Sequence, residues 1–322
     1  YPPGYVNNHL QLRELSLSCP NVLVPRKISR MIPNSGPTIA DTIGSTPLVR
    51  LDRLTAGHDV TVWAKLEFFN PGGSAKDRTA HAMVAASDLR PGDTVVESSS
   101  GNLGVALARE AVLGGWSFHC VVDPRTNRAT IAHMKALGAT VHEVTEPDPA
   151  TGDWLTARRA RVAELLTEID GATCLDQYSN PAAFRAHDEG TMTEIVRQLG
   201  HAPDHLVVAV STTGTVGGCL RHIAAHDLPT RVTAVDAEGS VLFDGRAGER
   251  HLPGFGAGMV PKLAESVRPH RVLRINDRES VAAARRLVRL EAILPGASGG
   301  AVAAGVEKLL PELAPGSEVV II

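Results

Sequence analysis

The chain has 322 residues, of which 43% are hydrophobic and 21% charged, and these values are typical of a globular protein. Its 32 basic and 35 acidic side chains give a net charge of -3, which argues against a nucleic-acid partner. No apolar run reaches the roughly 18 residues of a membrane span, and the first residues lack the pattern of a secretory signal. We therefore expect a cytoplasmic protein without nucleic-acid or membrane partners.

The four cysteines and thirteen histidines do not form a metal-binding pattern. Cys19, Cys120, Cys174 and Cys219 lie far apart, and no two of them make a C-x-x-C pair. The histidines are scattered, and none lies at ligand spacing from a cysteine or another histidine in a pattern typical of zinc. We expect buried, reduced thiols and no metal.

Residues 1–40 are rich in proline and show little periodicity, so we interpret them as an N-terminal extension. From Asp41 on, short β-branched runs alternate with Ala- and Leu-rich stretches. The β-branched runs predict strands over Val60–Leu66, Thr94–Glu97, Ser117–Val122, Thr140–Val144, His205–Val210, Arg231–Asp236, Arg271–Ile275 and Glu318–Ile322. The stretches between them predict helices over Thr79–Leu89, Asn102–Leu113, Thr130–Leu137, Trp154–Ile169, Ala182–Leu199, Thr215–His226, Arg278–Leu290 and Gly299–Leu313.

Repeated strand–helix–strand units predict the α/β class, with mainly parallel sheets and helices on both faces. The continuously apolar runs Val207–Val210 and Val319–Ile322 agree, because a strand buried on both faces has no polar side. Since a chain seldom ends on a core strand, we expect further residues after Ile322.

The first of four glycine-rich turns reads Asn-Pro-Gly-Gly-Ser-Ala-Lys over residues 70–76. A lysine at the start of a helix lies near the positive end of the helix dipole, where its ammonium form is disfavoured. The resulting neutral amine is what Schiff-base chemistry requires. Lys76 could equally be an ordinary surface lysine on a loop.

The other three turns also precede predicted helices. Residues 98–104 read Ser-Ser-Ser-Gly-Asn-Leu-Gly and could bind a carboxylate or phosphate, or simply cap a helix. Residues 211–215 read Ser-Thr-Thr-Gly-Thr, and their hydroxyls and backbone N–H groups predict a site for a cofactor phosphate. This turn lacks the Gly-Lys-Ser/Thr of a nucleotide-binding loop. The fourth turn, residues 295–300, offers the hydroxyl of Ser298.

Two long motifs carry a resemblance to a known family. Residues 43–51 read Ile-Gly-Ser-Thr-Pro-Leu-Val-Arg-Leu, and residues 65–78 read Lys-Leu-Glu-Phe-Phe-Asn-Pro-Gly-Gly-Ser-Ala-Lys-Asp-Arg. These motifs resemble the cysteine synthase and cystathionine β-synthase family of pyridoxal-phosphate enzymes of fold type II. The resemblance runs from about Asp41 to Ile322. It implies pyridoxal 5'-phosphate as cofactor, two doubly wound domains and a homodimer.

The resemblance also implies roles for individual residues. Lys76 corresponds to the lysine that binds the cofactor covalently and moves the α-proton. The other implied cofactor ligands are Asn102 at the 3-hydroxyl, Ser298 at the pyridine nitrogen, and Ser211, Thr212, Thr213, Gly214 and Thr215 at the phosphate. The implied substrate ligands are Ser99, Ser100, Gly101, Gln177 and the glycine-loop residue Gly254. A serine at the ring nitrogen makes a weaker electron sink than an aspartate would, which suits β-elimination to an aminoacrylate.

The implied domains are a large cofactor-binding one, residues 41–76 and 182–322, and a smaller movable substrate domain, residues 77–181. Three segments, Cys120–Pro124, Glu146–Arg158 and Val235–Val241, resemble a narrower branch, the N-(2-amino-2-carboxyethyl)-L-glutamate synthases. That branch serves 2,3-diaminopropionate formation in siderophore and peptide-antibiotic pathways. Trp154 departs from the branch, where a tyrosine is expected.

The resemblance thus implies condensation of O-phospho-L-serine with L-glutamate, with release of phosphate. Such anionic substrates require basic side chains at the cleft, and the candidates are Arg125, Arg128, Arg158, Arg159 and Arg185. Two alternatives remain. One is a cysteine synthase acting on O-acetylserine or O-phosphoserine, and the other is a non-catalytic sensor or scaffold with the same fold.

Overall fold

The structure, a computed structural model, describes residues 37–322 of the chain, and Ile39–Ile322 form one compact unit. Of the predicted N-terminal extension, residues 1–36 lie outside the described residues, as does Cys19. Cys120 and Cys219 are buried as expected, whereas the expectation of a buried thiol is wrong for Cys174, whose residue is exposed.

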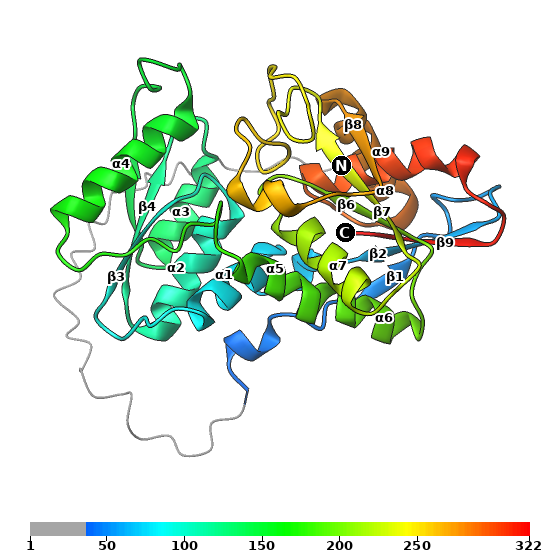
Figure 1. Ribbon diagram of the computed structural model, residues 1–322, viewed down its shortest axis with the longest axis horizontal. Coiled ribbons are helices and arrows are strands. Elements are labelled where there is room, and N and C mark those ends of the chain that lie inside the picture. Colours follow the sequence, from blue (N-terminus) through cyan, green and yellow to red (C-terminus); the bar gives the residue numbers. More distant parts are fainter. Residues whose placement is uncertain (1–36) are drawn as a thin grey trace, which may run out of the picture. The chain divides into compact units, whose positions relative to one another are not determined.

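Two sheets organise the described residues (Figure 1). The larger one has six strands in the order β1-β2-β9-β6-β7-β8. Their bounds are β1 Leu48–Arg50, β2 Val60–Lys65, β6 His205–Ala209, β7 Arg231–Ala237, β8 Arg271–Ile275 and β9 Ser317–Ile321. The smaller sheet has the order β3-β4-β5, with β3 Thr94–Ser98, β4 Ser117–Val122 and β5 Thr140–Glu143. Every pairing is parallel except that of β1 with β2, which confirms the predicted mainly parallel α/β fold.

The helices pack on both faces of each sheet. Their bounds are α1 Lys76–Ala85, α2 Asn102–Gly114, α3 Arg128–Ala136, α4 Trp154–Glu168, α5 Ala182–Arg185, α6 Thr193–Leu199, α7 Gly214–Ala225, α8 Asp277–Glu291 and α9 Ala297–Leu309. In the large sheet, Val207 and Val235 pack toward α8 and α9, while their neighbours Leu206 and Ala234 pack toward α5 and α7. This alternation explains the continuous apolar run Val207–Val210, because side chains on both faces of the strand pack against helices.

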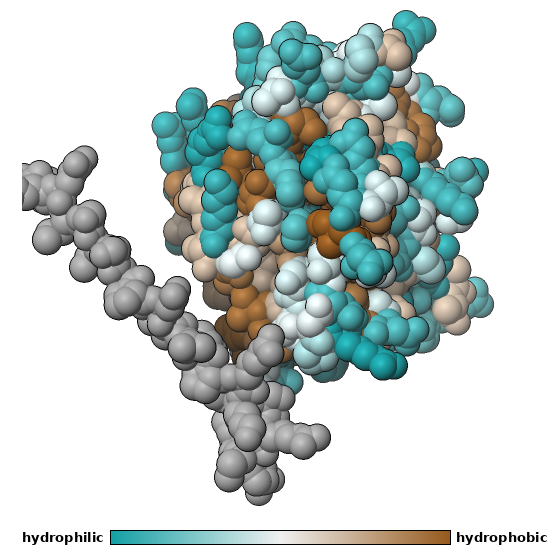
Figure 2. All heavy atoms as spheres, turned by 90° about the vertical axis from the view of Figure 1, so that its left-hand side faces the viewer, coloured by the Kyte–Doolittle hydropathy of each residue, from teal (hydrophilic) through white to brown (hydrophobic). Residues whose placement is uncertain are grey.

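The small sheet is buried in the same way. Val95 and Cys120 pack in one cluster with residues of α1, α2 and α3, whereas Val96 and Val121 pack against α4. Figure 2 views the molecule from the side of this sheet and shows hydrophobic atoms exposed between hydrophilic side chains. Within residues 37–322 no helix is both long and apolar enough to cross a membrane.

The predicted strands agree with the structure to within one residue at each end, and the differences concern one short strand and four helices. Strand β1 was not predicted, because three residues that follow a proline carry too little pattern. The helix predicted over Thr79–Leu89 lies over Lys76–Ala85, and just before it the Ser74 hydroxyl accepts a hydrogen bond from the Lys76 N–H at 3.2 Å. Helix α3 begins at Arg128, because the Asn127 side chain accepts from the Ala129 N–H.

Of the two remaining helices, one is interrupted and the other ends early. The helix predicted over Ala182–Leu199 contains a π-helical segment, Ala186–Met192, between α5 and α6. Such bulges are frequent at functional sites. Helix α9 ends at Leu309, four residues earlier than predicted, because Pro311 has no N–H to continue the helical hydrogen bonds.

Candidate active site

The glycine-rich turns meet at two adjoining cavities. The first cavity is lined by Lys76, by the turn over residues 211–215 and by Ser298. The second is lined by the turn over residues 99–102 and by Gln177. Lys76, Asn102, Ser211, Thr212 and Gly254 line both cavities. The structure thus brings together every site residue expected from the sequence, and their individual roles stay predictions.

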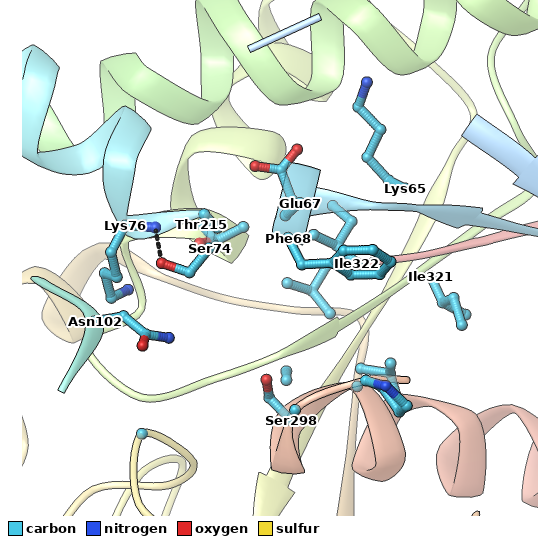
Figure 3. A pocket seen from close by; sticks show the side chains of 18 of the residues that line it. Lys65, Glu67, Phe68, Ser74, Lys76, Asn102, Thr215, Ser298, Ile321 and Ile322 are labelled. Carbon is cyan, nitrogen blue, oxygen red and sulfur yellow. Dashed lines mark hydrogen bonds between the residues drawn. The ribbon is translucent and has the colours of Figure 1, made fainter. Parts of the chain in front are cut away.

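Lys76 is the first residue of α1, and its side chain extends into the first cavity toward Asn102 (Figure 3). Burial of the ammonium group lowers the pKa of Lys76 below its usual value. The sequence argument relied on the helix start for this effect, whereas the structure gives desolvation as its cause. A lysine amine with a lowered pKa can act both as a nucleophile toward an aldehyde and as a base.

A buried ion network fixes the start of α1. The Arg78 guanidinium lies 2.8 Å from Glu67 and 2.7 Å from Glu194, and the Lys65 amine donates to Glu194 at 2.7 Å. Arg78 follows Lys76 by two residues, so this network limits how far Lys76 can move. Sequence reasoning missed it, although Lys65, Glu67 and Arg78 all belong to the second long motif.

The turn between β6 and α7 lines the first cavity. Thr213 adopts a positive φ of 66°, and its buried hydroxyl has no hydrogen-bond partner within the described residues. Thr215 contacts the buried His187 at 3.2 Å. The Ser211 hydroxyl donates to the Gly256 carbonyl at 3.0 Å, so it joins this turn to the loop that contains Gly254 and Gly256. The first N–H groups of α7 have no helical acceptor and can bind an anion.

The turn before α2 holds one serine hydroxyl in a hydrogen bond and leaves other residues available for a ligand. The Ser99 hydroxyl accepts from the Gly104 N–H at 2.9 Å, although the N-cap residue of α2 is Gly101 and not a serine. Gln177 is buried, and its amide donates to the Ser98 carbonyl at 2.9 Å. Asn102, the first residue of α2, is exposed toward both cavities. The turn therefore keeps Ser100, Gly101 and Asn102 available for a ligand.

Ser298 is the second residue of α9 and lies across the first cavity from Lys76 (Figure 3). Its hydroxyl makes no hydrogen bond to any described residue. The residues Phe68, Ile321 and Ile322 line the same cavity. A planar ring could pack between these apolar groups while Ser298 and Asn102 contact its polar edges.

Of the five arginines considered from the sequence, only Arg125 and Arg158 line the second cavity. Arg128 is exposed and pairs with Glu143, and Arg159 lies over the Tyr178 ring at 6.0 Å. Arg185 does not line either cavity. The structure adds Arg250, which sequence reasoning missed because no motif distinguishes it on its loop.

Comparison with known proteins identifies the family of this site. The family profile described as pyridoxal-phosphate dependent enzyme matches residues 39–322. The chain belongs to the pyridoxal-phosphate dependent enzymes. It is 41% identical, over 85% of its length and 82% of the relative's, to an N-(2-amino-2-carboxyethyl)-L-glutamate synthase from Ralstonia nicotianae.

Solved structures of pyridoxal-phosphate enzymes have the same fold. An O-ureido-L-serine synthase superposes with a TM-score of 0.81 at 29% identity, covering 89% of this chain and 91% of its own. An O-acetylserine dependent cystathionine beta-synthase from Helicobacter pylori superposes with a TM-score of 0.82 at 28% identity, covering 91% and 95%. These matches confirm fold type II, the cofactor and a β-substitution enzyme, so the non-catalytic alternative is wrong.

The residues in the first cavity fit pyridoxal phosphate. The unpartnered hydroxyl of Thr213 and the start of α7 suit its phosphate, and the amine of Lys76 suits its aldehyde. When bound, the cofactor withdraws electrons from the substrate's α-carbon and so makes the α-proton acidic. The chain then has to bind the substrate carboxylate, hold the α-proton at the Lys76 amine and keep water away from the reacting carbon.

Proposed function

We propose that the protein condenses O-phospho-L-serine with L-glutamate to N-(2-amino-2-carboxyethyl)-L-glutamate and releases phosphate. The observation that carries this proposal is the second cavity, where three arginines lie next to the predicted cofactor lysine. Sulfide, the small acceptor of a cysteine synthase, would need no such group of cations. The 41% identical synthase supports the same assignment.

The roles of the chain follow from the geometry. The turn over residues 99–102 and Gln177 would bind the donor's α-carboxylate through N–H and hydroxyl groups. The Lys76 amine would accept the α-proton while the bond from Cβ to the phosphate oxygen breaks. The glutamate amine would then form a bond to Cβ and lose a proton, and Lys76 would return the proton to Cα. Phosphate leaves with its oxygen, so atoms and charge balance.

The experiment uses the purified holoenzyme and follows the two halves of the reaction separately. O-phospho-L-serine alone should release about one phosphate per active site, and adding glutamate should start continuous release with a product of the expected mass. Aspartate, which is one methylene shorter, should be a much poorer acceptor because a site that pairs two carboxylates depends on their spacing. Rapid turnover with sulfide and none with glutamate would show a cysteine synthase instead. The homodimer, the cytoplasmic location and the two domains stay predictions.

A further inference from the structure

The three arginines of the second cavity differ in their charge partners. Asp123 lies 3.0 Å from the Arg125 guanidinium and 3.3 Å from Arg158 Nε, so this one carboxylate serves both arginines. These arginines hold the pKa of Asp123 below its usual value, against the effect of its burial. Arg250 has no carboxylate within ion-pair distance among the described residues. It is thus the arginine of this cavity whose charge is least compensated.

The surroundings of Arg250 hold it in this state. Its Nε is buried without a hydrogen-bond partner in the described part of the chain, and its Nη1 makes only a long contact of 3.4 Å to the Phe255 carbonyl. A Cβ at Gly256 or Gly258 would lie 3.3 or 3.1 Å from the guanidinium nitrogens. Glycines at these positions therefore leave the space that the Arg250 side chain occupies.

The nearby acids accept hydrogen bonds from other groups. Asp153 caps α4 by accepting from the Thr156 N–H at 2.7 Å, and Asp277 accepts from the His251 N–H at 2.9 Å. Asp236 accepts from the Ala237 N–H at 2.9 Å, and burial raises its pKa to about 6. Arg125 adds a second positive charge near Arg250, and the repulsion between the two cations strengthens the attraction of this site for an anion. A half-buried cation with open donors is a strong site for a carboxylate, because charge-assisted hydrogen bonds are the strong ones.

We propose that Arg250 binds the side-chain carboxylate of the acceptor amino acid and so selects a dicarboxylate over sulfide and over neutral amino acids. This inference rests on the proposed function and names the residue that determines which acceptor amino acid is bound. The donor's phosphate is a second possible anion, since it also carries negative charge. Arg250 lines only the second cavity, whereas Ser298 and Thr213 line only the first, so Arg250 lies apart from the residues predicted to hold the cofactor's ring nitrogen and phosphate. That position favours the far end of the acceptor.

The test compares Arg250→Gln and Arg250→Lys with the parental holoenzyme. Arg128→Gln is the matched control, because Arg128 is 75% exposed and lies outside both cavities. Cofactor content and thermal unfolding are measured first, so that a folding defect is recognised. The measurements are the KM for glutamate, glutamine and sulfide, the glutamate dissociation constant by calorimetry, and phosphate release from O-phospho-L-serine alone.

Arg250→Gln should raise the KM and the dissociation constant for glutamate on the order of ten- to hundredfold, as expected for a lost charge-assisted bond. The preference for glutamate over glutamine should largely disappear, while kcat, the reaction with sulfide and phosphate release change little. Arg250→Lys should lie between the two, because it keeps the charge without the planar fork. Arg128→Gln should behave like the parental enzyme.

Two results would overturn the inference and leave the proposed function intact. One is unchanged glutamate selectivity in a folded, cofactor-loaded Arg250→Gln variant. The other is a specific loss of phosphate release from O-phospho-L-serine, which would assign Arg250 to the donor. If the parental enzyme itself uses sulfide and not glutamate, the proposed function is wrong and the inference with it. In case Arg250→Gln does not fold, Arg250→Lys alone decides through its KM for glutamate.

Discussion

Lys76 shows how a common residue type acquires reactivity from its place in the fold. Lysines are mostly exposed and charged, yet this one begins a helix whose next turn is fixed by buried ion pairs, and burial lowers its pKa. Lys65 is also deeply buried, but it donates to Glu194, Gln198 and the Thr46 carbonyl, so its amine is fully engaged. Burial alone does not make a lysine reactive, because the amine must also be free to bond.

We predict that the cofactor is attached to Lys76. Borohydride reduction of the holoenzyme followed by digestion should give a peptide that carries the cofactor's mass on Lys76. Lys76→Ala should lose both this peptide and turnover with any acceptor. Lys135→Ala, which changes an exposed lysine on α3, is the control and should keep both. Turnover of Lys76→Ala at the parental rate would contradict the assigned role.

At the scale of the element, the turn before α7 has an unfavourable free energy that a bound ligand can lower. Thr213 has a positive φ, which is unfavourable for a β-branched residue, and its buried hydroxyl lacks a partner within the described residues. A buried hydroxyl without a hydrogen bond costs about 1–3 kcal/mol. A cofactor phosphate oxygen would supply the missing partner.

Thr213→Val keeps the shape and the backbone preference and removes the hydroxyl. We expect the cofactor dissociation constant to rise about tenfold or more, since a hydrogen bond to a charged group contributes about 1.5–3 kcal/mol. The cofactor-free protein should be equally stable or more stable, because an unsatisfied group has gone. Absorbance titration with pyridoxal phosphate and thermal unfolding measure the two effects. Thr167→Val on the surface of α4 should change neither, and equal cofactor affinity in Thr213→Val would contradict this role.

How far the sequence predicts each element depends on the range of the interactions that form it. Strands such as β4 and β8 were predicted to the residue, because runs of apolar and β-branched residues are a local signal. The site turns were also predictable, since glycines and hydroxyls lie together along the chain. The ion pair of Arg78 with Glu194 joins residues far apart in the sequence, and so does the cavity that Arg250 lines. No local sequence pattern predicts such contacts.

At the scale of the molecule, the ion network around Arg78 links Thr46, Lys65 and Glu194, which lie far apart in the sequence. Burial by itself would raise the pKa of the Glu194 carboxyl, but hydrogen bonds from Arg78 and Lys65 outweigh it and lower the pKa to about 2. The unfolded chain has the usual glutamate pKa of about 4.3. The ionised carboxylate therefore stabilises the fold fully above about pH 4.3, and this contribution is lost as the pH falls toward 2.

Glu194→Gln should lower the free energy of unfolding by about 3 kcal/mol at pH 7, because it leaves buried cations without their partner. The difference from the parental protein should shrink as the pH falls from about 4.3 toward 2. Denaturant unfolding at several pH values measures it. Glu164→Gln removes an exposed partner of Arg161 and should cost less than about 1 kcal/mol. A difference that stays constant down to pH 2 would mean that the carboxylate charge is not responsible.

Strand β9 lies between β2 and β6, and its pairings include Val60 with Ser317 and His205 with Val319. The lysine that follows β2 and the phosphate turn that follows β6 are therefore joined by a strand made some two hundred and fifty residues after β2. Pairings this distant in sequence carry a large loop-closure entropy and form slowly. The large sheet is therefore continuous between these two elements only once β9 has been made, so its completion comes late in synthesis.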